Sequence, residues 1–113
     1  MELTPGGYTT VAVSRCLDLE FQYWDTELNA AYRAALATAK SIDAEGSIGP
    51  RGRANAEENL RAMQRAWIPY RDARCDFESS KWGGGSGGGP ATIGCLMQET
   101  ARQTLILREG FGL

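Results

Sequence analysis

The chain has 113 residues, of which 42% are hydrophobic and 23% are charged. This composition is typical of one globular domain and excludes a disordered chain, so we treat residues 1–113 as a single domain. A net charge of −2 offers no basic surface to nucleic acid. No apolar run reaches the length that crosses a bilayer, so we expect neither a nucleic-acid partner nor a transmembrane segment.

A long first helix is predicted over residues 9–44. No proline or glycine interrupts this stretch, and the hydroxyl of Thr9 or Thr10 can cap its first turn. Apolar residues recur in steps of three and four, which places them on one helix face. The predicted inward stripe is Val13, Leu17, Phe21 or Glu20, Trp24, Leu28, Tyr32, Ala35 and Ala39.

A second helix is predicted over residues 53–79, after a break that contains Pro50 and three glycines. Pro69 lies inside this helix and removes one backbone donor. Because the apolar stripe continues beyond Pro69, we expect a kink there and not a helix end. The predicted inward stripe is Ala56, Leu60, Met63, Trp67, Tyr70 and then Arg74 or Cys75.

The stretch GGGSGGGP (83–90) predicts a loop, and a third helix is expected over residues 91–108. Its expected inward residues are Ile93, Leu96 or Met97, Thr100, Ala101, Thr104, and Leu105 or Leu107. No strand pattern is evident. Three helices with short connections predict an all-α fold, an antiparallel three-helix bundle with a long first helix.

Three cysteines are present, Cys16, Cys75 and Cys95. In an antiparallel hairpin of the second and third helices, Cys75 and Cys95 face each other across the glycine loop, so we predict a disulfide between them. Such a bridge stabilises the fold by about 3 kcal/mol in the chain-entropy account. Cys16 is left over. It is either buried as a small apolar residue or paired with a cysteine upstream of this sequence.

The sequence contains no histidine, which excludes catalytic triads that use histidine and leaves no histidine ligand for zinc. We therefore predict no catalytic residue, no metal site and no cofactor. Arg71 can stack on an aromatic ring or pair with Asp25 or Glu20 of the first helix. Candidate partner-binding residues lie in the two connections: Arg51 and Arg53 in the first, Trp82 and Ser86 in the second.

Three segments together resemble one known family. They are WDTELNAAY (24–32), LRAMQRAWIPYRDARCDFE (60–78) and CLMQETARQTLIL (95–107). This pattern is similar to the N-terminal domain of LprI-type lysozyme inhibitors and covers most of the chain from Cys16 onward. Within it, the residues that define the structural motif are Trp24, Asp25, Leu28, Asn29, Tyr32, Gln64, Trp67, Tyr70 and Arg71.

The resemblance implies an exported bacterial helical domain with the Cys75–Cys95 bridge and an upstream partner for Cys16. Residues 1–8 lack the basic and apolar regions of a signal peptide, so we expect a periplasmic or secreted protein whose leader is not part of this sequence. The expected function is non-enzymatic binding, with a lysozyme-like muramidase as the implied partner. The alternative is a structural or assembly component of the bacterial envelope.

Overall fold

A computed structural model describes residues 10–46, 48–50, 52–85 and 87–110 of the chain. Three helices dominate it, α1 (Thr10–Ala44), α2 (Ala56–Ser80) and α3 (Gly88–Gly110), with two short strands, β1 (Ile48–Gly49) and β2 (Gly52–Arg53), between α1 and α2. The predicted all-α fold and its long first helix are thus confirmed. The hairpin of β1 and β2 was not predicted, since two residues per strand are too few to show alternation.

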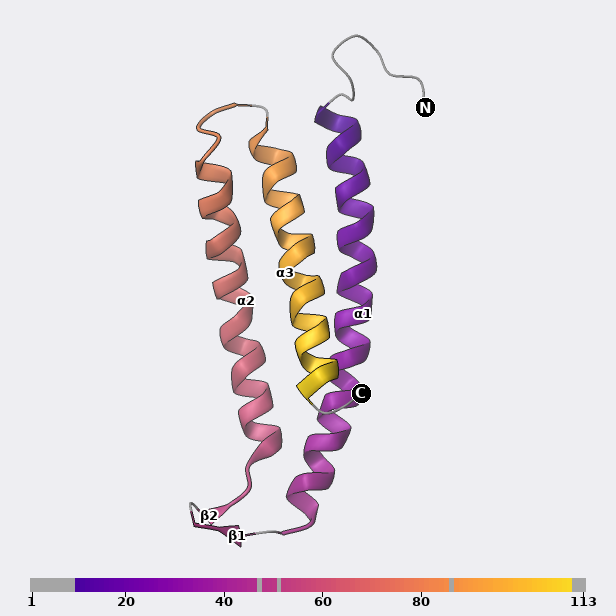
Figure 1. The fold of residues 1–113 in the computed structure, drawn as a ribbon, viewed down its shortest axis with the longest axis vertical. Coiled ribbons are helices and arrows are strands. Elements are labelled where there is room, and N and C mark those ends of the chain that lie inside the picture. Colours follow the sequence, from indigo (N-terminus) through magenta and orange to yellow (C-terminus); the bar gives the residue numbers. More distant parts are fainter. Residues whose placement is uncertain (1–9, 47, 51, 86, 111–113) are drawn as a thin grey trace.

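The molecule is a flat rod with principal extents of 64 × 29 × 14 Å. Along it α2 runs antiparallel to α1 and to α3, and α3 lies between the other two helices (Figure 1). The most extensive helix contact is between α1 and α3, the first and last helices of the chain. A central position explains why most of the buried polar side chains belong to α3.

The apolar core is small and rich in alanine. Its fully buried members are Leu28, Ala31, Ala35, Ala39, Leu60 and Leu107, with Tyr32, Leu36, Ala56 and Trp67 packed against them. Alanine at these α1 positions lets neighbouring helices approach closely. The predicted α1 stripe is therefore confirmed in its second half, where the core lies.

The inward face of α2 differs from the prediction. Met63 and Tyr70 were expected inside, but both are exposed, and so is Leu105 of α3, which leaves Leu107 as the buried alternative. Polar side chains occupy the interface instead: Gln103 of α3 donates a hydrogen bond to Gln64 of α2 at 3.1 Å. Helix α2 continues through Pro69, as the stripe indicated.

The remaining helix boundaries shift for local reasons. Helix α2 begins at Ala56 and not at residue 53, because Gly52 and Arg53 pair with β1. Helix α3 begins at Gly88 and not at 91, and Pro90 falls in its first turn, where a missing backbone donor has no cost.

Candidate functional site

The predicted partner-binding residues do not form one site. Arg53 lies on β2 at one end of the rod, whereas Trp82 follows α2 at the opposite end (Figure 1). Arg51 and Ser86 lie outside the described residues. Given a rod 64 Å long, one small partner surface cannot contact both ends, so Arg53 and Trp82 belong to two separate candidate surfaces.

We call Gly46, the strands β1 and β2, and Ala54–Asn55 the hairpin end. Ile48 pairs with Arg53, and Gly49 pairs with Gly52. Gly46 and Gly52 both have positive φ, 68° and 96°, a backbone conformation that residues with a Cβ atom rarely adopt. The hairpin leaves Ile48 71% exposed. Arg53 is also exposed and lines a hollow of about 490 Å³. An apolar and a cationic side chain are therefore both exposed at the pair of residues that opens the hairpin.

A carboxylate from α1 fixes this hairpin end. The Asp43 Oδ1 and Oδ2 atoms accept hydrogen bonds from the backbone N–H groups of Ala56 and Glu57, at 2.7 and 3.0 Å. These N–H groups begin α2, and Asn55 makes no side-chain cap of its own. Asp43 thus caps the second helix from the end of the first. Sequence reasoning missed it, because capping signals are sought immediately before a helix.

The first turn of α2 carries further negative charge. Glu57 and Glu58 lie there, where the helix dipole favours acidic residues. The Glu57 carboxylate accepts a hydrogen bond from the exposed Arg61, which raises the pKa of that guanidinium above its ordinary value. The charge of Arg61 is therefore balanced by Glu57. The guanidinium of Arg53, by contrast, lies beside Gly46, which has no side chain.

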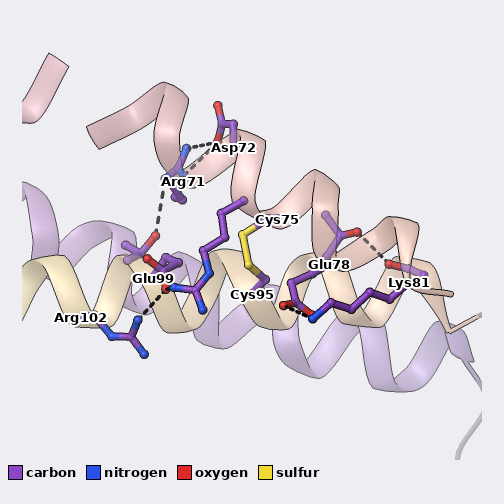
Figure 2. The surroundings of a disulfide bond; sticks show 12 residues. Arg71, Asp72, Cys75, Glu78, Lys81, Cys95, Glu99 and Arg102 are labelled. Atoms are coloured by element: carbon purple, nitrogen blue, oxygen red, sulfur yellow. Dashed lines mark hydrogen bonds and ion pairs between the residues drawn. A yellow bond between two sulfur atoms is a disulfide. The ribbon is translucent and has the colours of Figure 1, made fainter. Parts of the chain in front are cut away.

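We call Lys81–Gly85 and Gly87, together with α2 from Cys75 and α3 up to Cys95, the loop end. Cys75 and Cys95 form the predicted disulfide, with their Cα atoms 5.5 Å apart (Figure 2). Trp82 is 55% exposed, and a Cβ added to Gly87 would overlap its six-membered ring. Glycine at 87 is therefore needed for close approach of the backbone to the Trp82 ring, a reason that the glycine-rich composition alone did not reveal.

Arg71 contacts all three helices. Its guanidinium lies 5.0 Å from the ring centroid of Trp67 on α2 and 5.9 Å from that of Phe21 on α1. The same group donates to Thr100 Oγ1 of α3 at 3.5 Å and pairs with Asp72 at 3.0 Å. The predicted stacking is confirmed. The alternative, a pairing with Asp25 or Glu20 of α1, is not the one observed, because the guanidinium pairs with Asp72 of its own helix.

A shared carboxylate joins α2 and α3 one helical turn beyond the disulfide. Glu99 is 6% exposed, and its Oε2 accepts from Arg74 Nη1 at 2.6 Å and from Arg102 Nη1 at 2.9 Å. Figure 2 shows Glu99 and Arg102 on one side of the disulfide and Glu78 and Lys81 on the other. Two cations on one oxygen hold the buried charge and fix both arginines.

The other motif residues divide into core and surface. Leu28, Tyr32 and Trp67 belong to the core or pack on it, and Trp24 meets Tyr23 edge to face at 5.3 Å. Asp25 and Asn29 are exposed on α1. Cys16 is a free, exposed cysteine, so the alternative that it is buried is wrong.

Metal ligation and membrane spanning can both be judged for the described part of the chain. Within residues 10–46, 48–50, 52–85 and 87–110, no group of three His, Cys, Asp or Glu side chains is placed to hold a metal ion. No described helix is both long and apolar enough to span a bilayer.

The chain is similar in sequence to one known protein family and to one individual protein. The family described as "Lysozyme inhibitor LprI" matches residues 4–107. An uncharacterised protein of Rhizobium meliloti (strain 1021) is 36% identical over 94 residues, which cover 83% of this chain and 68% of the relative. No solved structure matches the chain significantly.

Proposed function

This chain belongs to the LprI lysozyme inhibitor family, and on that premise we propose that it is a non-enzymatic protein that binds and inhibits a lysozyme-like muramidase. The match over residues 4–107 carries the proposal, because it includes all three helices up to Leu107 and the connections between them. The disulfide is consistent with an oxidising compartment, which supports export to the periplasm or the exterior.

The hairpin end is the contact surface that the geometry favours. A glycosidase of this class holds two carboxylates in a cleft that must admit a sugar chain. A narrow projecting hairpin with an exposed cation fits such a concave, acidic site better than a flat helical face does. Arg53 supplies the cation and Ile48 the apolar contact, while Asp43 restrains the hairpin so that less entropy is lost on binding.

The loop end is less suited to this target. Its cation, Lys81, is paired with Glu78 at 2.9 Å and stacks over Phe77. Trp82 is aromatic and uncharged, so it offers no attraction to a pair of carboxylates. We therefore assign the inhibitory contact to Arg53, with Arg51 as a second candidate from the sequence.

The proposal is tested by two measurements on the purified protein. The first is the initial rate of cell-wall lysis by a lysozyme with increasing amounts of the protein. The second is direct binding of the protein to the enzyme without substrate. Arg53→Glu is expected to weaken both by about tenfold or more, because a charge reversal opposes the acidic cleft.

Arg33→Glu is the matched control, since Arg33 is an exposed arginine in the middle of α1. We expect it to inhibit like the wild type. Full lysozyme activity at a large molar excess of wild-type protein would reject inhibition of that enzyme. Equal losses for Arg53→Glu and Arg33→Glu would reject the hairpin end as the contact surface.

A second candidate function rests on exposed apolar side chains of α1. Leu19 and Tyr23 are neighbours on one helix face and are 59% and 57% exposed. Such a face suits an assembly component of the envelope that associates with itself. Sedimentation analysis tests it: a stable oligomer that Leu19→Ser dissociates supports assembly, and a monomer at all concentrations rejects it.

A further inference from the structure

We propose that the seam between α2 and α3 is a binding groove for a neutral oligosaccharide, with Tyr70 and Trp82 as stacking platforms and the Arg74–Glu99–Arg102 cluster as the polar centre. This inference does not depend on lysozyme inhibition, because it concerns another surface and another class of ligand. It starts from the hollows that the two helices leave between them.

Two hollows adjoin along this seam. One, of about 330 Å³, has Trp82 at its end and Gln98 on its α3 side. The other, of about 250 Å³, is lined by Tyr70 and Arg102. Arg74 and Glu99 line both, so the two hollows meet at this ion pair, and we treat them as two halves of one groove. Small-molecule sites typically combine such a concave surface with a few fixed polar groups.

Both aromatic side chains are open to a ligand. Tyr70 is 58% exposed and Trp82 is 55% exposed, although each is large and apolar. Tyr70 lies about 15 Å along the helix axis before Ser80, the last residue of α2, and Trp82 follows that end, which leaves room for a short glycan between the two rings. The C–H faces of a pyranose ring stack on aromatic rings, and the backbone of Gly87 lies close to the Trp82 ring.

The polar centre is already organised for hydrogen bonding. Arg74 and Arg102 each use Nη1 to hold Glu99, and the further N–H groups of these partly exposed guanidiniums are suited to sugar hydroxyls. Cys95, which lines the same groove, is bridged to α2. The positions of the arginines are thus fixed before a ligand arrives, which lowers the entropy lost on binding.

The charge balance identifies the class of ligand. Two arginines that line the groove, Arg74 and Arg102, face two carboxylates, Glu78 and Glu99. Lys81, which pairs with Glu78, adds one positive charge at the edge, an excess too small to select a polyanion. A docking helix of a protein partner would place an apolar stripe on this seam. It would then bury the charged centre against apolar side chains at a cost in free energy. A neutral, hydroxyl-rich ligand satisfies both the rings and the arginines.

The test is calorimetric titration of the full chain with two neutral probes, tetra-N-acetylchitotetraose and cellotetraose. The first carries acetamido groups and the second only hydroxyls, so together they distinguish the two kinds of glycan. We expect saturable binding of at least one. Tyr70→Ala and Arg102→Ala should each weaken it by about tenfold, since each removes one stacking or hydrogen-bonding contact.

Phe77→Ala is the matched control. Phe77 is an exposed aromatic residue of α2, 61% exposed, that does not line the groove. Its affinity should stay within about twofold of the wild type, and circular dichroism checks that every variant is folded. The proposal is overturned if neither probe binds, or if Phe77→Ala weakens binding as much as Tyr70→Ala does. If lysozyme binding is lost in Tyr70→Ala while no glycan binds, the seam is a protein-docking face instead.

Discussion

At the two ends of the rod, neighbouring helices are joined by different interactions. At the loop end, a covalent bond between Cys75 and Cys95 joins α2 to α3. At the hairpin end, one carboxylate, that of Asp43, joins α1 to α2 through two backbone hydrogen bonds. Redox conditions therefore act on the loop end, whereas the hairpin end depends on one side chain.

The two proposed activities also belong to different parts of the molecule. The hairpin end presents an exposed cation, Arg53, beside an exposed apolar residue, Ile48, which suits contact with an acidic cleft. The seam next to the loop end presents rings and paired charges, which suits a neutral ligand. Substitutions that loosen one end and leave the other intact can therefore show which end performs which task.

The largest effect is expected from removal of the disulfide. Cys75→Ser with Cys95→Ser should lower the free energy of unfolding by about 3 kcal/mol, because a loop of this length becomes free in the unfolded chain. Urea denaturation followed by circular dichroism measures it. Cys16→Ser is the control, since Cys16 is exposed and free, and it should change stability by less than about 0.5 kcal/mol. Similar losses in both proteins would contradict this account of the loop end.

A smaller loss is expected at the hairpin end. Asp43→Ala should lower the free energy of unfolding by about 1.5 kcal/mol, because two N–H groups at the start of α2 lose their acceptor. It should also weaken lysozyme binding, since the hairpin loses its restraint. Asp25→Ala, an exposed aspartate of α1, is the matched control and should be neutral. An Asp43→Ala protein as stable as Asp25→Ala would show that the cap contributes nothing.

The turn of the hairpin should tolerate a side chain at one glycine and not at the other. Gly52→Ala is expected to cost about 1 kcal/mol, because φ of 96° is unfavourable for any residue with a Cβ. Gly49→Ala is the comparison, since a Cβ there meets no atom and φ is not positive. Thermal unfolding of both variants measures the difference. No difference between them would mean that the backbone of the turn relaxes freely.

The smallest effect is expected between the two ends. Arg108 pairs with Glu27 at 2.7 Å, and both side chains are about one third exposed. Glu27→Gln should cost only about 0.5 kcal/mol, and the cost should shrink in high salt. Stability measured at low and at high salt checks this. A loss as large as that of Asp43→Ala would show that α1 and α3 depend on this ion pair more than on packing.

Sequence reasoning predicted the helices and the disulfide because these depend on local signals. Pro50, the glycines and steps of three and four placed the helices within a few residues, and two helix ends across one loop placed Cys75 beside Cys95. The inward face of α2 was wrong in part, because apolar periodicity selects Met63 and Tyr70. The structure uses Gln64 and Arg71 there, since α3 offers Gln103 and Thr100 as partners.

For the candidate sites too, local sequence signals do not show which residues come together in space. Arg53 and Trp82 were recognised as exposed residues of connections, but their separation by the length of the rod appears only when the helices are assembled. Asp43 could not be recognised at all, because the N–H groups it accepts from lie 13 and 14 residues further along the chain. The groove between α2 and α3 likewise combines side chains from two helices, and neither helix shows it alone.

The extensive contact between α1 and α3 has a consequence for the rate of folding. These helices are the first and the last of the chain, and the Arg108–Glu27 contact joins residues 81 positions apart. Helical proteins usually fold fast because their contacts are local, whereas here the main interface requires the closure of a long loop. The Cys75–Cys95 bridge shortens the path between α1 and α3 by bypassing the glycine loop. Oxidised protein should therefore refold faster than reduced protein, in addition to being more stable.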